Sequence, residues 1–290
     1  MDIPLSAVRA IVEQALAEDI GWGDITTRAL VPPDHRGRAK ALVKGEGVLC
    51  GIEVFALAFT LWDLALEVEA LMADGSPVRR GDIVAVVKGR ASSILTAERV
   101  ALNFLQRLSG IASTTRRFVQ EVGELPTRVL ETRKTTPGLR LLEKYAVRIG
   151  GGSNHRYNLS DGVLVKDNHL AVLRSYGGDL SEAIARARRN VPLTIKIEVE
   201  ATTVEEARAA VEAGADIILL DNMSVEEMKE AVRVIQATPS GDRGRVLVEA
   251  SGGITLEKVR AIAETGVDFL SSGALTHSFK SLDISLEIEV

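Results

Sequence analysis

The sequence predicts an α/β fold, in which an incomplete, TIM-like parallel α/β-barrel is preceded by a smaller α+β open-sandwich domain. Short strand-like runs punctuated by turn residues occupy about residues 26–90. From Thr127 onward, strand and helix patterns alternate with short connections, which indicates parallel strands joined by right-handed crossovers. Polar residues follow every predicted strand in this second half, and α/β-barrels assemble their active sites at that face.

The N-terminal part contains the elements of a small α+β domain. Residues 3–19 have the pattern of an amphipathic helix, and Asp74-Gly75-Ser76-Pro77 is a turn signal between two strands. The expected strands cover residues 38–44, 66–71 and 82–88, and a helix covers residues 53–64. A long helical segment follows, and Ser109-Gly110 is the expected domain boundary.

The second half supplies the barrel. The predicted strands cover residues 128–131, 162–166, 193–199, 216–221, 245–250 and 267–271, and the predicted helices cover residues 138–149, 180–190, 204–213, 225–236 and 256–265. Thr203 with Glu206 and Ser224 with Glu227 match the capping box that begins a helix. We therefore expect domains at residues 1–109 and 110–278, with the tail, residues 279–290, packed on the first.

Composition and charge restrict the class of function. The formal net charge of −5 provides no overall basic field to hold nucleic acid or an anionic membrane surface. Cys50 is the only cysteine, it stands in an apolar setting, and we expect it to be a buried packing residue rather than a nucleophile. The most apolar stretch, residues 54–62, is too short to span a bilayer. We expect a cytoplasmic protein that is neither secreted nor embedded in a membrane.

Each predicted strand of the second half ends in polar or ionisable residues. One such residue is ordinary at a loop start, but six strands in succession favour an active site. In order, the ends carry Arg133-Lys134, Lys166-Asp167, Glu198 and Glu200, Asp221-Asn222, Ser251-Gly252-Gly253 and Ser271-Ser272-Gly273.

The strand predicted at residues 193–199 has one charged face, formed by Thr194, Lys196, Glu198 and Glu200. A parallel strand covered on both sides should be apolar on both. Buried carboxylates need partners, which the basic strand ends or a cationic ligand could supply. The alternative is an edge strand with one solvated face.

Two glycine-rich turns predict a phosphate site. Ser251-Gly252-Gly253 precedes a helix expected to begin near Thr255, and Ser271-Ser272-Gly273 follows the next strand. Free N–H groups at helix starts bind anions, and barrels commonly place phosphate at their last two βα loops.

Residues 131–169 form a basic cluster inside an acidic chain. The segment contains seven lysines and arginines and four acidic residues, so its net charge is 7 − 4 = +3, whereas the net charge of the whole chain is −5. A solvated helix surface explains Arg140 and Lys144, but not Arg133-Lys134 at a strand end or His155-Arg156 shortly after three glycines.

These residues also carry a family resemblance. The strings Glu131-Thr-Arg-Lys-Thr-Thr-Pro-Gly-Leu-Arg140, Gly150-Gly-Gly-Ser-Asn-His-Arg156 and Lys166-Asp-Asn-His169 resemble quinolinate phosphoribosyltransferase, the carboxylating nicotinate-nucleotide pyrophosphorylase. The resemblance continues through Leu219-Leu-Asp-Asn222 and Gly273-Ala-Leu-Thr-His-Ser278 and covers nearly the whole chain. Ser272 departs from it, because an apolar residue is expected there.

The resemblance implies an activity, a cofactor and a partner. Ribose 5-phosphate passes from phosphoribosyl pyrophosphate to the nitrogen of quinolinate, carbon dioxide is lost, and nicotinate mononucleotide and pyrophosphate are formed in de novo NAD biosynthesis. The family uses Mg²⁺. It forms homodimers with shared active sites, in which the small domain of one subunit helps to cover the barrel mouth of the other; a hexamer is the larger alternative.

The resemblance also implies roles for individual residues. Quinolinate is bound by Arg133, Arg156 and Arg99, the last lent by the partner subunit. Further substrate contacts come from Thr132, Lys134, His155 and Lys166. Glu198 and Asp221 hold the ribose hydroxyls or the Mg²⁺ shell, directly or through water. The 5-phosphate contacts Ser251, Gly252, Gly253, Ser271, Ser272 and Gly273. The catalytic set is Lys134, Lys166, Glu198 and Asp221.

Three alternatives stay open at this point. An aldolase-like barrel enzyme would form a Schiff base through Lys166 on a sugar phosphate. A related phosphoribosyltransferase would act on nicotinate without decarboxylation. A non-catalytic protein would only bind phosphorylated nucleotides.

Overall fold

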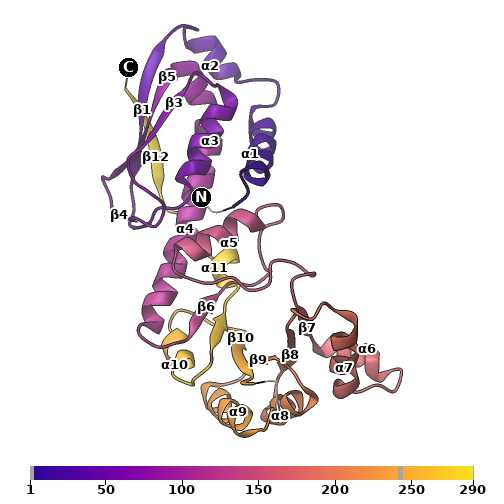
Figure 1. Cartoon of the computed structure of the whole chain (residues 1–290). Coiled ribbons are helices and arrows are strands. Elements are labelled where there is room, and N and C mark those ends of the chain that lie inside the picture. Colours follow the sequence, from indigo (N-terminus) through magenta and orange to yellow (C-terminus); the bar gives the residue numbers. More distant parts are fainter. Residues whose placement is uncertain (1–2, 241–243, 290) are drawn as a thin grey trace. The chain divides into compact units, whose positions relative to one another are not determined.

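The computed structural model describes residues 3–240 and 244–289, which form two compact units (Figure 1). The first unit comprises the described parts of residues 1–116, 135–151 and 275–290. The second comprises those of residues 117–134 and 152–274. The division expected at Ser109-Gly110 falls inside a helix, α4 (Ala91–Val122), and stays a prediction.

The first unit is built on an antiparallel sheet in the order β12-β1-β5-β3. These strands are β12 (Ile284–Glu289), β1 (Arg36–Val43), β5 (Ile83–Arg90) and β3 (Glu67–Ala70), and β2 (Gly47–Val48) pairs separately with β4 (Pro77–Val78). Because β12 pairs with β1 along its length, the C-terminal tail is part of this sheet. The β1, β3 and β5 strands lie within two residues of the predicted ranges at either end.

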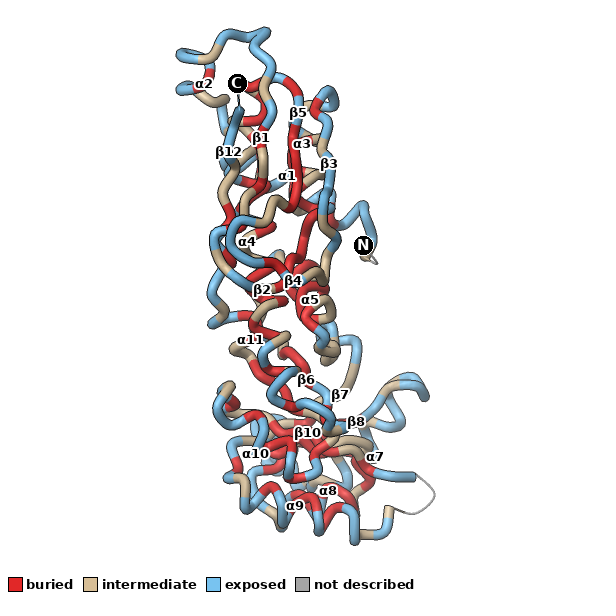
Figure 2. Tube along the Cα trace, turned by 90° about the vertical axis from the view of Figure 1, so that its left-hand side faces the viewer, coloured by how far each residue is buried: buried red, intermediate tan, exposed pale blue. Residues whose placement is uncertain are grey.

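Helices complete the first unit: α1 (Leu5–Ile20), α2 (Ile25–Leu30), α3 (Ile52–Trp62), the N-terminal part of α4, and α5 (Arg140–Ile149). Buried residues, red in Figure 2, run along α3 and β5. Cys50 is fully buried, and burial, with the nearby Asp74 carboxylate, raises the pKa of its thiol, so it is a packing residue as predicted. Asp74 accepts hydrogen bonds from the backbone N–H groups of Gly51 and Ile52 and so fixes the start of α3.

The second unit contains six parallel strands in one sheet of order β6-β11-β10-β9-β8-β7. They are β6 (Arg128–Leu130), β7 (Val163–Val165), β8 (Ile197–Ala201), β9 (Ile217–Asp221), β10 (Leu247–Ser251) and β11 (Phe269–Ser271). The first strand pairs with the last, so the order is that of a barrel opened between β6 and β7. An isolated bridge joins Leu130 to Ser153 at this opening. The incomplete barrel is confirmed.

The helices of the second unit follow the predicted alternation. They are α6 (Asp167–Arg174), α7 (Leu180–Asn190), α8 (Val204–Ala213), α9 (Val225–Ala237) and α10 (Val259–Ala263). A short helix, α11 (Ala274–His277), follows the last strand and belongs, except for Ala274, to the first unit. The capping box at Ser224 and Glu227 is present in full. At α8, Thr203 caps the helix, but Glu206 bonds to Thr202 instead of closing the box.

Two boundaries differ from the prediction for local reasons. Residues 192–196 form a turn, closed by the Ile195 N–H donating to Pro192 O, so β8 begins at Ile197 and excludes Thr194 and Lys196. The helix expected near Thr255 begins only at Val259, because the Lys258 and Val259 N–H groups close turns on Thr255 O. The predicted helix N-terminus beside Gly253 is therefore wrong.

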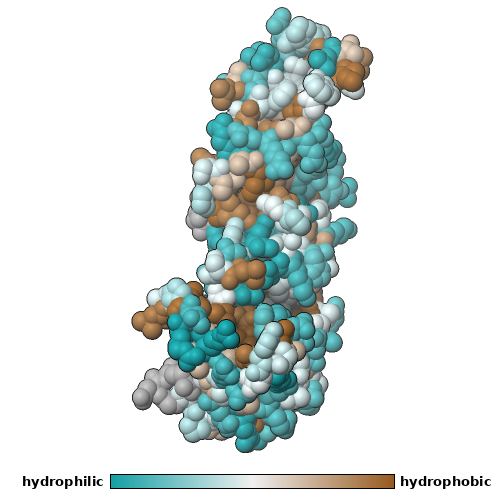
Figure 3. Space-filling view, turned by 90° about the vertical axis from the view of Figure 1, so that its right-hand side faces the viewer, coloured by the Kyte–Doolittle hydropathy of each residue, from teal (hydrophilic) through white to brown (hydrophobic). Residues whose placement is uncertain are grey.

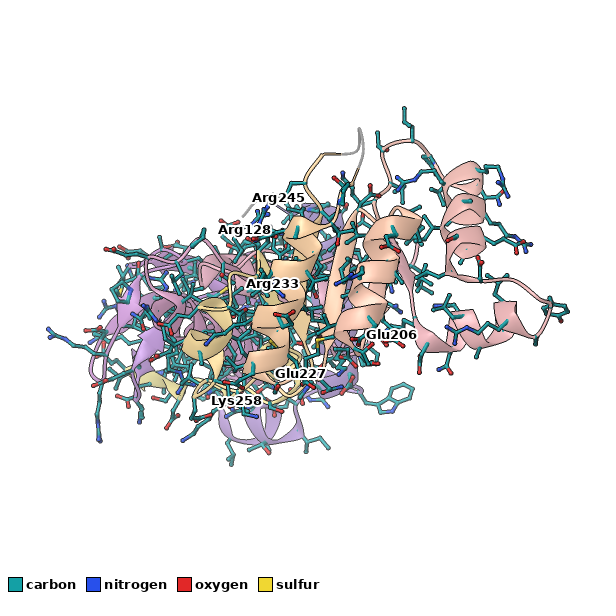
Figure 4. All side chains as sticks on the ribbon, turned by 90° about the horizontal axis from the view of Figure 1, so that it is seen from below. Arg128, Glu206, Glu227, Arg233, Arg245 and Lys258 are labelled. Carbon is teal, nitrogen blue, oxygen red and sulfur yellow. The ribbon has the colours of Figure 1, made fainter. Side chains whose placement is uncertain are left out.

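The amino ends of the strands are held by half-buried aspartates. Asp216 accepts hydrogen bonds from the Ile197 N–H (2.8 Å) and from Arg188 (3.0 Å), which ties α7 and β8 to the start of β9. In Figure 4, Arg128 and Arg245 mark this end, whereas Glu206 and Glu227 mark the opposite end, where α8 and α9 begin. The polar strand ends therefore lie at the face opposite to these anchors.

On the face shown in Figure 3, hydrophobic side chains reach the surface both singly and in patches. None of the described helices combines the length and the apolar composition that crossing a bilayer requires.

Candidate active site

The strand register brings side chains from neighbouring strands of the second unit to common levels inside the barrel. Residues paired in parallel strands point to the same face. Glu200, Leu219 and Glu249 stand at one level, and Asp221, Ser251 and Ser271 stand at the next level toward the carboxyl ends. Ser271 donates a hydrogen bond to Ser251 (3.1 Å). The polar strand ends therefore form one continuous layer.

A pocket of about 420 Å³ opens over this layer. Most of the predicted site residues line it: Thr132, Arg133, Lys134, His155, Arg156, Lys166, Asp221, Ser251, Gly252, Gly253 and Ser271. Leu164, Glu200, Leu219, Asn222 and Glu249 complete the lining. Four cations from three segments of the chain thus meet at one cavity, as the sequence predicts.

The cations come from three segments, of which one follows β6, one lies between β6 and β7, and one follows β7. Arg133 and Lys134 follow β6, and the Lys134 N–H donates to Thr132 Oγ1 (3.1 Å). Arg156 enters from the segment that fills the opening between β6 and β7, and it donates to Gly162 O (2.9 Å). Burial and the neighbouring positive charge of Arg133 lower the pKa of Arg156. Two guanidinium groups so close together favour an anion between or beside them.

Lys166 is paired with a carboxylate at the end of β8. Its Nζ lies 2.5 Å from Glu200 Oε2, and Glu200 is largely covered. The Lys166 N–H also donates to His169 Nδ1 (3.0 Å), which fixes the first turn of α6. His169 thus supports the backbone of Lys166 and does not line the pocket.

The loops after β9 and β10 interlock. Asn222 has a positive φ of 55°, and its backbone N–H donates to Ser251 O (3.0 Å). Gly252 also has a positive φ, and a Cβ there would stand 2.3 Å from Asn222 Oδ1. Only glycine satisfies both the conformation and the close approach. The side chain of Asn222 in turn donates to Asp221 (2.9 Å).

A buried ionic group lies beneath the pocket. His155 Nε2 is 3.2 Å from Glu198 Oε2 and 3.4 Å from Glu249 Oε2. Glu198 and Glu249 are 5% and 2% exposed. Among the described residues, these three form the one group of histidine, cysteine and acidic side chains close enough to hold a metal ion. Its separations allow hydrogen bonds between the ring nitrogen and an oxygen of either carboxylate.

Glu198 does not line the main pocket. It lies one level below Glu200 and lines a second pocket of about 210 Å³ toward the amino ends of the strands. It is buried in the interior of the sheet, between β7 and β9, so the edge-strand alternative is wrong. Glu198 and Glu200 stand at alternate positions of the same strand, so the sequence alone does not show which of the two carboxylates reaches the pocket.

Three further predicted site residues lie off the pocket lining. Ser272 is buried and donates its hydroxyl to Ile254 O (3.0 Å), and Gly273 follows it at the start of α11. Arg99 is an exposed residue of α4 in the first unit. Glu249 lines the pocket and was not selected from the sequence, because an apolar-flanked glutamate inside a strand shows no chemistry by itself.

The comparisons with known proteins agree with this architecture. The family model for the quinolinate phosphoribosyl transferase N-terminal domain matches residues 24–109, and the C-terminal domain model matches residues 111–287. The chain is 45% identical over 278 residues to a probable nicotinate-nucleotide pyrophosphorylase [carboxylating] of Synechocystis, covering 96% of this chain and 91% of that protein. A protein of Bacillus subtilis with the same description is 41% identical, with 97% and 93% covered.

Solved structures give the same answer at the level of the fold. The crystal structure of NadC from Streptococcus pyogenes superposes with a TM-score of 0.91 at 41% identity, covering 100% of this chain and 99% of that one. The nicotinate-nucleotide pyrophosphorylase of Francisella tularensis gives a TM-score of 0.89 at 38% identity, covering 99% of this chain and 98% of that one. The chain therefore belongs to the quinolinate phosphoribosyltransferase family.

Proposed function

We propose that the pocket at the carboxyl ends of the parallel strands is the active site in which this chain carries out the reaction of its family. That reaction is the decarboxylating transfer of a phosphoribosyl group to quinolinate in de novo NAD synthesis. The observation that carries the site assignment is the gathering of Arg133, Lys134, Arg156 and Lys166 around one cavity in a chain of net charge −5.

The charge of the reactants accounts for this gathering. Quinolinate carries two carboxylates, and phosphoribosyl pyrophosphate carries a monophosphate and a pyrophosphate. Arginine presents a planar fork that suits paired contacts to carboxylate oxygens, so Arg133 and Arg156 are assigned to quinolinate. Lys134 and Lys166 provide compact charges that suit phosphate and pyrophosphate oxygens.

The interlocked loops suit the 5-phosphate. Ser251 and Ser271 offer hydroxyl groups, and the turn through Gly252 and Gly253 presents backbone N–H groups at the pocket. The support for this assignment comes from the loops themselves rather than from a helix N-terminus. Ser272 and Gly273 would contribute through their backbone.

Carboxylates on the opposite wall suit the ribose and the metal ion. Asp221 and Glu200 line the pocket, and carboxylate oxygens are the ligands that Mg²⁺ prefers. Glu200 fits the role expected of Glu198 better, because Glu198 lies a level lower in the second pocket. These residues would hold Mg²⁺ directly or through water, and the ion would neutralise charge on the departing pyrophosphate.

The chain's own groups can stabilise the charges that develop. As pyrophosphate leaves, positive charge grows on the ribose carbon, and Asp221 and Glu200 can stabilise it. Lys134 can stabilise the leaving oxygens. After the ring nitrogen is alkylated, its positive charge stabilises the carbanion left by the departing carboxylate, so no protein nucleophile is required. The Nζ of Lys166 is held by the Glu200 carboxylate, whereas a Schiff base requires that nitrogen to attack a carbonyl carbon, so the contact disfavours the Schiff-base alternative.

We further propose a cytoplasmic homodimer, or a hexamer of such subunits, in which Arg99 of one subunit reaches the active site of its partner. The exposure of Arg99 on α4 supports this proposal. The single cysteine supports the reducing compartment.

The test of the proposed function is product formation by the purified chain with Mg²⁺, phosphoribosyl pyrophosphate and either quinolinate or nicotinate. With quinolinate as the acceptor, we expect nicotinate mononucleotide and an equal amount of carbon dioxide. With nicotinate as the acceptor, we expect no product. Turnover of nicotinate with no release of carbon dioxide from quinolinate would assign the related activity instead.

A further inference from the structure

Two separate segments of the chain are joined just before the two arginines of the pocket. The Ser153 N–H donates to Val129 O (2.8 Å), and a parallel bridge pairs Leu130 with Ser153. One residue beyond this bridge, the side-chain amide of Asn154 donates to Glu131 Oε2 (2.8 Å). The connection between the end of β6 and the segment that fills the barrel opening therefore continues through a pair of side chains.

The two arginines follow this connection at equal offsets. Arg133 is the third residue after Leu130, and Arg156 is the third residue after Ser153. Both line the main pocket, and burial together with the positive charge of Arg133 lowers the pKa of Arg156. Groups of like charge repel each other, so the spacing of the two guanidinium groups has to be held by the chain.

Glu131 and Asn154 are placed to hold that spacing without facing the reactants. Glu131 is completely buried, Asn154 is half-buried, and neither lines the main pocket. Glu131 lies two residues before Arg133, and Asn154 lies two residues before Arg156. Loss of their hydrogen bond would take a donor from a buried carboxyl group and release one arginine-bearing segment from the other.

The far end of the same segment also holds Arg156. Its guanidinium group donates to Gly162 O (2.9 Å), directly before β7. The stem of its side chain passes close to Gly162, where an added Cβ would stand 3.7 Å from it. Arg156 is therefore supported toward β7 by Gly162, and the contact between Asn154 and Glu131 supports the segment toward β6.

We propose that Glu131 and Asn154 are positioning residues, whose hydrogen bond sets the spacing of the two pocket arginines. This spacing selects a dicarboxylate with neighbouring carboxylates over a monocarboxylate. The identity of the ligand rests on the proposed function, because quinolinate carries its carboxylates on adjacent ring carbons. Each arginine presents a planar fork to one carboxylate. A monocarboxylate such as nicotinate engages one fork and does not depend on the distance between the two.

The test compares the binding of quinolinate and nicotinate by calorimetry without phosphoribosyl pyrophosphate, so that no reaction occurs. The affinity for nicotinate is obtained from its competition with quinolinate, and the wild-type chain should bind quinolinate more tightly. Asn154→Ala removes the donor and leaves Glu131 in place. We expect its affinity for quinolinate to fall about tenfold and that for nicotinate less than about threefold, because only the dicarboxylate needs both forks at a fixed distance.

Steady-state kinetics give a readout that a general loss of stability would not produce. In Asn154→Ala, the KM for quinolinate should rise about tenfold, whereas kcat and the KM for phosphoribosyl pyrophosphate should stay within about twofold. Asn158→Ala is the matched control, because Asn158 is an exposed residue of the same segment whose side chain accepts from the Ser160 N–H (2.9 Å). It should change none of these values.

An exchange of donor and acceptor tests whether the two side chains act through their contact. Asn154→Asp places a second carboxyl group against Glu131, so it should weaken quinolinate binding at least as much as Asn154→Ala. The double variant Asn154→Asp with Glu131→Gln again contains one donor and one acceptor, in exchanged positions, and should recover most of the loss. A folded double variant without any recovery would overturn the proposal.

The outcomes separate this proposal from the proposed function. If Asn154→Ala folds but loses affinity for both acids equally, or for neither, the positioning role is wrong, whatever the turnover of the wild type. Equal affinity of the wild type for the two acids, or no binding of either, would overturn it as well. A wild-type chain that binds quinolinate selectively but forms no product would remove the proposed reaction and support the selection of a dicarboxylate.

A structure keeps the proposal testable if the variants do not fold. In a crystal structure of the wild-type chain with quinolinate, we expect one carboxylate on each of Arg133 and Arg156, with the hydrogen bond from Asn154 to Glu131 intact. Both arginines on the same carboxylate, or a broken hydrogen bond in the complex, would overturn the proposal.

Discussion

At the scale of residues, the site depends on charge brought together from segments that are distant in sequence. Arg133 stands at the end of β6, and its buried Nε has no hydrogen-bond partner in the described structure. A buried cationic donor without an acceptor destabilises the fold, and the carboxylate of a bound ligand would accept its hydrogen bond. Arg133 is thus prepared for an anion rather than for a structural partner.

The first prediction concerns Arg133 and its neighbour. Arg133→Ala and Lys134→Ala should each lower kcat/KM by about a thousandfold or more, because each removes a cation from substrate contact. The melting temperature should change little, since both side chains stand at a strand end. Steady-state kinetics and calorimetry on the same preparations check this. Near-normal activity in either variant would count against the site assignment.

The second prediction concerns the glycine that lets two loops meet. Gly252→Ala adds a Cβ in collision with Asn222 at a positive φ, so it should destabilise the fold by about 1–3 kcal/mol and raise the KM for phosphoribosyl pyrophosphate. Gly177→Ala is the matched control, because Gly177 has a positive φ of 82° but open space around its Cβ position. If the KM for phosphoribosyl pyrophosphate rises equally in both variants, the close contact between Gly252 and Asn222 does not have the role proposed for it.

At the scale of elements, the two ends of the barrel have different roles, one in the candidate site and one in stability. The carboxyl ends carry the pocket, whereas the amino ends carry aspartates whose oxygens accept hydrogen bonds from backbone N–H groups of the neighbouring, preceding strand. Asp268 accepts from the Val248 N–H (2.9 Å) as Asp216 does from Ile197. In α/β-barrels this end serves stability rather than chemistry.

The third prediction follows from that division. Asp216→Ala should cost about 1.5–3 kcal/mol of the free energy of unfolding, because it leaves the Ile197 N–H and Arg188 without their charged acceptor. The activity per folded molecule should not change. Denaturant unfolding followed by kinetics at low temperature checks both, with the exposed Glu212→Ala as control. A loss of kcat in the folded variant would show that this end also shapes the pocket.

The elements that the sequence predicts best are those with local signals. Ser224 and Glu227 announce α9, and the strands β6, β7, β9, β10 and β11 lie within two residues of their predicted ranges at either end. The start of β8 was placed too early, because the run of alternating residues continues into a turn at Pro192. The predicted helices do not include α2, α6 and α11, because all three are short, and α6 begins within the motif Lys166-Asp-Asn-His169.

The same limit explains the site. Its cations stand at strand ends and in matched motifs, so the sequence identifies them. The level of a carboxylate within the barrel depends on register between strands far apart in the chain, which no local pattern records. For this reason the sequence points to Glu198, whereas Glu200 lines the pocket, and it does not predict the pairing of Glu249 with His155.

At the scale of the whole molecule, the role proposed for Arg99 depends on a second subunit. Arg99 lies in the first unit, outside the pocket lining, and its proposed role is in the site of a partner. Complementation tests this directly, because a hybrid dimer can contain one complete site even when both parent proteins are inactive.

The fourth prediction is that Arg99→Ala and Lys134→Ala are each inactive alone and recover activity when mixed under conditions that exchange subunits. Random pairing should restore about a quarter of the wild-type activity, since half of the dimers are hybrids with one intact site each. Mixing two preparations of Lys134→Ala is the control. If mass spectrometry confirms subunit exchange but the mixture recovers no activity, Arg99 acts in the active site of its own subunit.

The central claim, that these cations form one binding site for a small dianion, is tested most directly by a crystal structure of the chain with quinolinate. We predict density for the pyridine ring in the pocket over Asp221 and Ser251, with its carboxylates in contact with Arg133 and Arg156. Quinolinate bound at full occupancy elsewhere, with these two arginines unchanged, would contradict the account.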